Sequence, residues 1–228
     1  MSRYSFTVPD SIESAREIQQ QARSLVIPED RLDPVGLVAG VDVGFEENNT
    51  ITKAAIVVLN FPSLEVVETS IARMPTGFPY VPGFLSFREI PAILEALEHL
   101  KTNPDLYLCD GQGIAHPRRL GIASHLGVAI DRPTIGVAKS LLVGKHAPLG
   151  EEKGAWTPLI DKKETIGAVF RSRTRVKPLY ISIGHRVSLE TAIDRVSRCL
   201  TKYRLPEPTR LADKLSKKEG GEVRNLGT

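Results

Sequence analysis

The 228-residue sequence lacks the features that mark several classes of protein. Its two cysteines, Cys109 and Cys199, are too few for a disulfide framework or a zinc-binding set. No apolar run approaches the roughly 20 residues of a membrane-spanning helix, and the first residues lack the apolar segment of a secretory signal. We therefore expect a protein of a reducing, cytoplasmic compartment that has no membrane span.

Charge of one sign is also scarce, because the formal net charge is only +3. That value identifies no partner, so the distribution of the cations is more informative. Between residues 171 and 177 every second position is an arginine or a lysine, and on a strand all four would lie on one face. This pattern indicates a stripe that contacts phosphates. A solvated strand face explains it equally well.

The remaining composition and the hydrophobic pattern predict an α/β fold. With 41% hydrophobic residues, the chain can bury one sizeable core, so we expect a single domain. Strands are expected over residues 37–45, 53–61, 64–73, 105–110, 134–139, 154–158, 165–171 and 179–182, and helices over 11–26, 91–101, 117–126 and 188–202. Three hairpin-linked strands followed by strand–helix alternation predict one mixed central sheet with helices on its faces. Residues 214–228 are expected to form a flexible tail.

Two aspartates interrupt apolar strands and are candidates for catalysis. Asp42 lies inside the strand 37–45, and Asp110 ends the strand 105–110. Acids are depleted in strands and costly to bury unless they are paired or bind a metal. One such aspartate often only hydrogen-bonds a nearby turn, whereas two on consecutive core strands favour a shared cation, and Mg²⁺ suits this arrangement. A bound metal would activate water for in-line attack on a phosphodiester.

Glu89 is a third candidate, with a competing structural explanation. Ser86 and Glu89 have the spacing of a capping box, in which the glutamate only closes a helix N-terminus. Pro91 argues against that cap, because proline prefers the first helical position and a helix from Ser86 would bury it further inside. We therefore expect the helix to begin near Pro91 and favour a functional role for Glu89, with the cap left open.

The loops near these acids carry basic residues. If Pro117 is the first residue of a helix, Arg118 and Arg119 lie in its first turn, which favours an anion bound nearby. The alternative is surface salt bridging, for which the adjacent sequence supplies no acids. Gly111 would let the backbone come close to a ligand. Lys139, at the end of the strand 134–139, either neutralises phosphate or is simply solvated.

A stiff loop presents an aromatic side chain. Pro79 and Pro82 frame Tyr80. The ring could stack on a base or fill the gap left by an extruded base. A tyrosine packed in its own turn is just as good an explanation from the loop alone.

Taken together, these stretches closely resemble endonuclease V, over roughly residues 11–213. The matching blocks follow the order found in that family. They are Val41–Val43, Pro79–Glu89, Asp110–Arg118, Gly136–Ser140, Gly184–Leu189 and Leu205–Asp213.

The resemblance implies an RNase-H-like fold, with residues 1–213 as the catalytic domain. It also implies Mg²⁺ as cofactor, with Mn²⁺ able to substitute. The implied reaction is hydrolysis of the second phosphodiester 3′ to deoxyinosine, leaving 3′-hydroxyl and 5′-phosphate ends. By resemblance the metal-site carboxylates are Asp42, Glu89 and Asp110, with Asp213 as a further ligand, and Lys139 and His116 lie near the scissile phosphate. Tyr80 is implied to be the strand-separating wedge, with Pro79, Pro82, Arg88 and Arg118 beside the DNA. The residues implied to enclose the flipped base are Gly83, Leu85, Gly111 and Ile122.

The expected partner is therefore inosine-containing DNA, with RNA as the other polymer to consider, and we expect a monomer. A snug pocket can exclude guanine, which differs from hypoxanthine by an exocyclic amine, and a mispaired inosine costs less to unstack. Three alternatives stay open: an RNase-H-like nuclease acting on inosine-containing RNA or branched DNA, a catalytically silent nucleic-acid-binding module, and a small-molecule phosphohydrolase. The last would leave the 171–177 cations unexplained.

Overall fold

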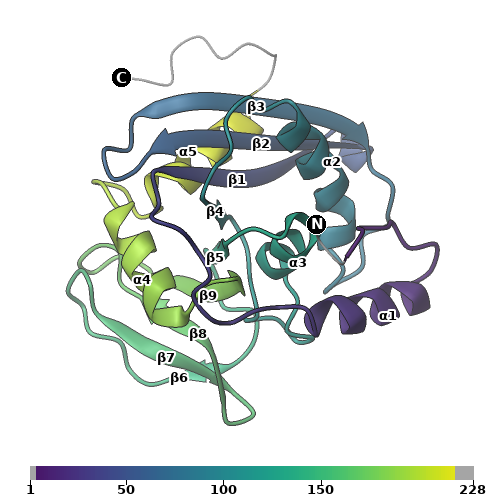
Figure 1. Cartoon of the computed structure of the whole chain (residues 1–228). Coiled ribbons are helices and arrows are strands. Elements are labelled where there is room, and N and C mark those ends of the chain that lie inside the picture. Colours follow the sequence, from purple (N-terminus) through teal and green to yellow (C-terminus); the bar gives the residue numbers. More distant parts are fainter. Residues whose placement is uncertain (1–3, 219–228) are drawn as a thin grey trace.

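The computed structural model describes residues 4–218. Within that range nine strands form one mixed sheet in the order β3-β2-β1-β4-β5-β9-β8-β7-β6 (Figure 1). The strands are β1 (Leu37–Glu46), β2 (Ile51–Asn60), β3 (Val66–Pro75), β4 (Leu106–Cys109), β5 (Thr134–Ala138), β6 (Lys145–His146), β7 (Trp156–Asp161), β8 (Glu164–Phe170) and β9 (Leu179–His185). Strands β1, β4 and β5 are parallel neighbours, so their carboxyl ends meet at one edge of the sheet.

Helices cover both faces of this sheet (Figure 1). They are α1 (Ile12–Arg23), α2 (Ser86–Glu98), α3 (Ile122–Ile130), α4 (Leu189–Arg198) and α5 (Glu207–Ser216). Residues of α2 and α3 share one hydrophobic cluster with the sheet, and residues of α4 and α5 share another. Helix α1 contacts α3. The expectation of a single RNase-H-like α/β domain with helices on both faces of a mixed sheet is confirmed.

Burial on both faces explains why the central strands could be predicted from the sequence. In β2 the eight residues from Thr52 to Leu59 are all buried, and the six from Ala54 to Leu59 form the continuous apolar run of a strand covered on both sides. The helix expected at 11–26 is α1, whose N-cap Ser11 accepts a hydrogen bond from the backbone of Ser14. The helix expected at 188–202 is α4, capped by Ser188 as predicted. Strand β6, with only two residues, was not expected.

The predicted start of α2 near Pro91 is wrong. The helix begins at Ser86 and contains Pro91 in its interior. Interior proline costs about 3 kcal/mol, whereas complete burial of Phe87 and Ile90 stabilises by about 1.5–3 kcal/mol each. Burial therefore outweighs the proline. The capping box is not formed either, because the hydroxyl of Ser86 is bonded to His125 Nδ1 at 2.9 Å.

The predicted helix start at Pro117 is also wrong, since α3 begins at Ile122. Arg119 has a φ of +57°, which a right-handed helix does not accommodate. Residues 111–121 instead form a compact loop held by backbone hydrogen bonds, among them Gly121 N–H to the carbonyl of Gly113 at 2.9 Å. The arginines at 118 and 119 therefore do not lie at a helix N-terminus.

Helix α5 was not predicted, and it overlaps the segment that was expected to be a flexible C-terminal tail. It extends through Lys214–Ser216, which were expected to belong to the flexible tail. Helix α5 lies against β1 because Gly40 has no side chain: a Cβ there would come 2.0 Å from the carbonyl oxygen of Pro208. Residues 219–228 of the predicted tail lie outside the described residues.

The cationic stripe expected at residues 171–177 does not form, because most of this segment is a turn and not a strand. Arg175 has a φ of +59°, so the two-residue alternation of a strand is lost. Its guanidinium contacts Glu151, and Arg171 donates to the backbone carbonyl of Gly150. The prediction of a shared strand face is therefore wrong, for the phosphate stripe and for the solvated face alike.

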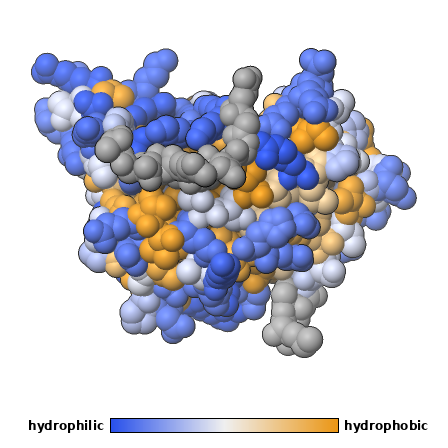
Figure 2. All heavy atoms as spheres, turned by 90° about the horizontal axis from the view of Figure 1, so that it is seen from above, coloured by the Kyte–Doolittle hydropathy of each residue, from blue (hydrophilic) through white to orange (hydrophobic). Residues whose placement is uncertain are grey.

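Hydrophilic residues dominate the face of the molecule seen from above, with smaller hydrophobic areas between them (Figure 2). None of the helices in the described range is long and apolar enough to cross a membrane.

Candidate active site

Three aspartates from distant parts of the chain meet at the carboxyl edge of the sheet. Asp42 lies in β1, Asp110 directly follows β4, and Asp213 lies in α5. One carboxylate oxygen from each lies within 4.8 Å of the others. The structure thus brings together two aspartates singled out from the strand pattern and one that only the family resemblance had suggested.

Cationic and hydroxyl groups hold these carboxylates in place. Lys139, which follows β5, forms ion pairs with both Asp110 and Asp213. Ser216 donates its hydroxyl hydrogen to Asp42. Lys217 adds an ion pair to Asp213 at 2.8 Å. Nothing in the sequence pattern pointed to Ser216, because it lies beyond the family blocks in a helix that was not predicted.

Electrostatics at the cluster favour an added positive charge. Burial, together with the nearby charges of Asp110 and Asp213, raises the pKa of Asp42 to about 7 against the opposing effects of the hydrogen bond from Ser216 and the charge of Lys139. Burial also raises the pKa of Asp213, but hydrogen bonds from Lys139 and Lys217 outweigh it and hold that pKa below its ordinary value. Lys139 and Lys217 therefore compensate only part of the negative charge of the cluster.

Glu89 stands beside this cluster and is the most strongly affected acid. It is buried in α2, with 9% of its surface exposed. Burial raises its pKa to about 8, and the charges of Asp42 and Asp110 act in the same direction. Its carboxylate is not among the three groups that lie within 4.8 Å of one another. A carboxyl held neutral next to two carboxylates is poised to ionise when a cation arrives.

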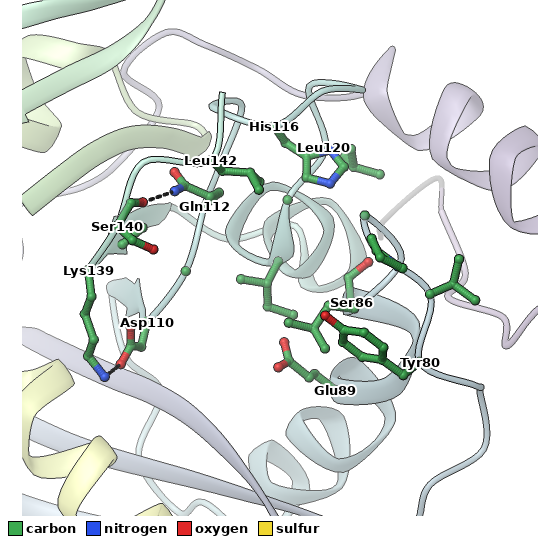
Figure 3. A pocket seen from close by; sticks show the side chains of 18 residues that line it. Tyr80, Ser86, Glu89, Asp110, Gln112, His116, Leu120, Lys139, Ser140 and Leu142 are labelled. Carbon is green, nitrogen blue, oxygen red and sulfur yellow. Dashed lines mark hydrogen bonds and ion pairs between the residues drawn. The ribbon is translucent and has the colours of Figure 1, made fainter. Parts of the chain in front are cut away.

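A recess of about 430 Å³ opens next to the acids (Figure 3). That volume falls within the range of small-molecule sites, about 300–1,000 Å³. Tyr80, Glu89, Asp110, His116 and Lys139 all line it. The four residues expected to enclose a base, Gly83, Leu85, Gly111 and Ile122, line it as well, as does Pro82. Lining residues that the sequence reasoning missed include Ser86, Gln112, Leu120, Ser140 and Leu142.

Gly111 and Ile122 face each other closely in the lining of the recess. A Cβ added at Gly111 would come 2.5 Å from Cγ2 of Ile122, closer than real side chains approach. A glycine at this position therefore keeps the recess open beside the end of β4. This gives a structural reason for the close backbone approach expected at Gly111.

At the rim, Tyr80 is 71% exposed, so it is not a packed turn residue. Arg88, in the first turn of α2, is buried and lies against the ring of Phe45, with Cζ 4.8 Å from the ring centroid. The same guanidinium lies 5.9 Å from the ring centroid of Tyr80. Pro79 is exposed beside it. The aromatic side chain is thus presented outward on a supported loop.

The wall opposite the acids is fixed by a set of donors that converge on one carbonyl. The carbonyl oxygen of Gly83 accepts hydrogen bonds from Arg118 Nη2 at 2.5 Å and from Gln19 Nε2 at 2.9 Å. Arg118 Nε also donates to Gln19 Oε1, and its guanidinium covers the ring of Phe84. Arg118 therefore positions the recess wall. Gln19, almost fully buried in α1, carried no signal in the sequence because its partners lie far along the chain.

His116 is part of the same wall. Burial, together with the charge of Arg118, lowers its pKa to about 4, so the ring is neutral at pH 7. Its Nδ1 accepts the backbone N–H of Arg118 at 3.2 Å, which places the ring proton on Nε2. Arg119 has a different role, because it pairs with Asp161 and Glu164 at 2.7 and 2.8 Å. The acids that the adjacent sequence lacked are thus supplied by the β7–β8 hairpin.

The donor set fits a hard divalent cation. The three clustered groups are all carboxylates, and Mg²⁺ binds oxygen ligands through one or two carboxylates together with waters and phosphate oxygens. Burial raises the pKa of Asp42, and the charges of Asp110 and Asp213 act in the same direction, so a bound cation would favour its ionised form. The residues able to hold such an ion are Asp42, Asp110 and Asp213, with Glu89 next to them.

Comparisons with known proteins agree over nearly the whole chain. A sequence model of the endonuclease V family matches residues 19–214. The endonuclease V of Rippkaea orientalis is 66% identical over 218 residues, which cover 96% of this chain and 95% of the relative. The crystal structure of endonuclease V from Streptomyces avermitilis superimposes with a TM-score of 0.88 at 43% identity, covering 92% of this chain and 93% of that one. Ciona intestinalis endonuclease V, solved with a 24mer DNA containing an inosine followed by a ribo-adenosine, gives 0.81 at 33% identity, covering 92% and 98%.

Proposed function

The chain belongs to the endonuclease V family, and from that premise we propose that it cuts nucleic acid strands beside inosine with the help of a divalent metal ion. It is a hydrolase of phosphodiester bonds, as its family membership establishes. The proposed cleavage position is the second phosphodiester 3′ to the lesion, leaving 3′-hydroxyl and 5′-phosphate ends. Mg²⁺ is the proposed cofactor, with Mn²⁺ able to replace it, and the enzyme is proposed to act as a cytoplasmic monomer.

One arrangement supports this proposal above all others. The recess that Tyr80 borders ends at Glu89, Asp110 and Lys139 (Figure 3), and Asp110 also belongs to the cluster of three aspartates. A base held in the recess would keep the phosphates of its own strand next to the acids. Recognition and hydrolysis can therefore act on one strand at a fixed separation.

The carboxylates supply the binding site for the metal, and a divalent cation there would stabilise the charge that builds up on the phosphate. Lys139 stays protonated, because its ion pairs with Asp110 and Asp213 raise its pKa against the effect of burial. It therefore balances negative charge at the phosphate side of the recess. Glu89, with its pKa raised by burial and its acidic neighbours, can hold a proton near neutral pH.

The recess walls account for base selectivity in the proposal. The wall contributed by Gly83 is held by Gln19 and Arg118, and the wall at Gly111 leaves no room for a side chain. A binding site can discriminate between similar ligands by placing a fixed group where the unwanted ligand would clash. Guanine carries an exocyclic amine that hypoxanthine lacks, so crowding at this amine would exclude the normal base.

A nicking assay tests this function. Labelled strands that are identical except for one inosine, uracil or adenine are incubated with the protein, with and without Mg²⁺, as single strands and as duplexes. We expect cleavage of the inosine strands alone, only with the metal, and products that a ligase can use because they end in 3′-hydroxyl and 5′-phosphate. Equal cutting of the adenine strand would refute recognition of inosine.

The same assay separates the second candidate, a related nuclease acting mainly on inosine-containing RNA or on branched DNA. The Ciona protein was crystallised with DNA whose inosine is followed by a ribonucleotide, which keeps RNA relevant as a substrate. Faster cleavage of an RNA strand with one inosine than of the matched DNA strand would favour this candidate. Cutting of a branched duplex without inosine would favour a junction nuclease.

A further inference from the structure

A basic surface lies at the tip of the β7–β8 hairpin. Lys162 and Lys163 form the two-residue turn, and Lys145 lies in β6, which pairs with β7. All three lysines are exposed. Within residues 4–218 none of them takes part in an ion pair.

The acids of the hairpin do not neutralise these lysines. Asp161 and Glu164 flank the turn, and both are engaged by the buried Arg119 at 2.7 and 2.8 Å. The positive charge of the turn is therefore left facing solvent. Lys162 and Lys163 also have positive φ values of 51° and 70°, a conformation that favours asparagine and glycine in such turns. Local turn chemistry thus gives no reason for two lysines here.

A surface hollow of about 570 Å³ lies between these cations. Lys145, His146, Ile160 and Lys162 line it, together with Gly144, Ala147 and Asp161. Ile160 is 44% exposed and provides an apolar floor. An apolar floor with cations at its edge suits the sugar and base of a nucleotide, whose phosphates then contact the lysines.

Two connections tie this hollow to the recess described above. Arg119 joins the hairpin tip to the segment that carries His116 and Leu120, both of which line the recess. On the other side, Leu142 lines the recess and Gly144 lines the hollow, so only Val143 separates them along the chain. A strand that leaves the recess on the His116 side would therefore reach the lysines next.

We propose that the surface formed by Lys145, His146, Ile160, Lys162 and Lys163 binds the part of the substrate strand that flanks the inosine, on the side of the recess away from Asp110. The occupant is a nucleic acid strand, recognised through its phosphates and without regard to sequence. This inference rests on the proposed function, since it assumes that the recess holds a base of the same strand.

The test compares two double variants that each remove two positive charges. Lys162→Gln/Lys163→Gln removes those of the hairpin tip. Lys101→Gln/Arg132→Gln is the control, because both residues are exposed and lie near the amino ends of β4 and β5, opposite the acids. Binding to an inosine-containing single strand is measured in EDTA over a range of salt concentrations, so that no cleavage occurs.

Two lost phosphate contacts should reduce the log–log salt slope of single-strand binding by about 1.4, and that of duplex binding by about 1.8. On single strands, the ratio of wild-type affinity to hairpin-variant affinity should therefore fall about 7-fold as the salt concentration rises from about 50 to about 200 mM. The control variant should keep the wild-type slope. Strands shortened from one end should abolish the difference between wild type and hairpin variant, whereas strands shortened from the other end should preserve it.

An unchanged slope for the hairpin variant would overturn the proposal, as would an equal loss in both variants. A deficit that persists on strands shortened from either end would also overturn it, because no flanking strand would then be contacted. Failure of the proposed function is a separate result. In that case the wild type would not nick inosine strands preferentially, whatever its binding slope.

Discussion

Glu89 offers a sharp test of the electrostatics of the site, because its pKa is raised from 4.5 to about 8, chiefly by burial. The folded state then binds a proton that the unfolded chain has already lost. This stabilisation is complete below about pH 4.5 and is lost as the pH rises through about 8. The variant Glu89→Gln keeps a neutral group of the same shape, so its stability should not share this loss.

The size of the effect follows from the same values. Each pH unit between 4.5 and 8 contributes about 1.4 kcal/mol, so the wild type loses at most about 5 kcal/mol relative to Glu89→Gln. A chain of this length changes its Tm by about 2–4 °C per kcal/mol. The variant should therefore gain at most about 10–20 °C over the wild type between acidic and alkaline pH.

Thermal unfolding in EDTA, followed by circular dichroism at several pH values, measures this difference without interference from a metal. Glu98→Gln is the matched control, because Glu98 is exposed at the end of the same helix. The difference between the Tm of Glu98→Gln and that of the wild type should stay constant above about pH 6. A difference between Glu89→Gln and wild type that is the same at acidic and alkaline pH would refute the burial argument.

Three further predictions concern the recess and its metal. Replacing Tyr80 with alanine should weaken binding by roughly 5- to 150-fold, more on duplex than on single strands, while phenylalanine should restore it; equal binding by the alanine variant would show that the ring contacts no base. Gly111→Ala should lower the rate of inosine nicking at least 10-fold, because the new methyl group would collide with Ile122. Gly111→Ala/Ile122→Ala removes that collision and should recover part of the rate. An inactive double variant would show that the collision with Ile122 is not the cause of the loss. Mg²⁺ binding at pH 7 should release roughly one proton, because Asp42 and Glu89 carry raised pKa values, which calorimetry in buffers of different ionisation heat detects as a buffer-dependent enthalpy. A buffer-independent enthalpy would contradict that linkage.

Many strands of the sheet were predictable because each one has its own hydrophobic pattern in the sequence. Strands such as β2 are buried on both faces, so most of their residues are apolar, as in the run from Ala54 to Leu59. The aspartates stood out against that background, since Asp42 and Asp110 break otherwise apolar strands. Their meeting followed from the rule that parallel strands share one carboxyl edge.

What could not be predicted depends on contacts between distant segments. Arg119 finds its acids more than 40 residues away in a hairpin, and the wall at Gly83 depends on Gln19 of the first helix. Helix α5 lies against β1, and Gly40 gives no sign of that contact in the sequence. Burial also reversed a local rule in α2, where Phe87 and Ile90 outweigh Pro91. Propensities describe the chain alone, whereas these features depend on what it packs against.

The central claim is that the carboxylates beside the recess perform the hydrolysis of a strand whose inosine the recess holds. Asp110→Asn tests it most directly, because the change removes one charge while keeping the size of the side chain. Single-turnover nicking and binding are measured on the same inosine-containing strand with Mg²⁺. The account predicts that the variant binds the strand with near wild-type affinity and unfolds at a similar temperature. It should nick roughly 100- to 1,000-fold more slowly, the loss typical when one group that stabilises transition-state charge is removed. Nicking by Asp110→Asn at close to the wild-type rate would contradict it.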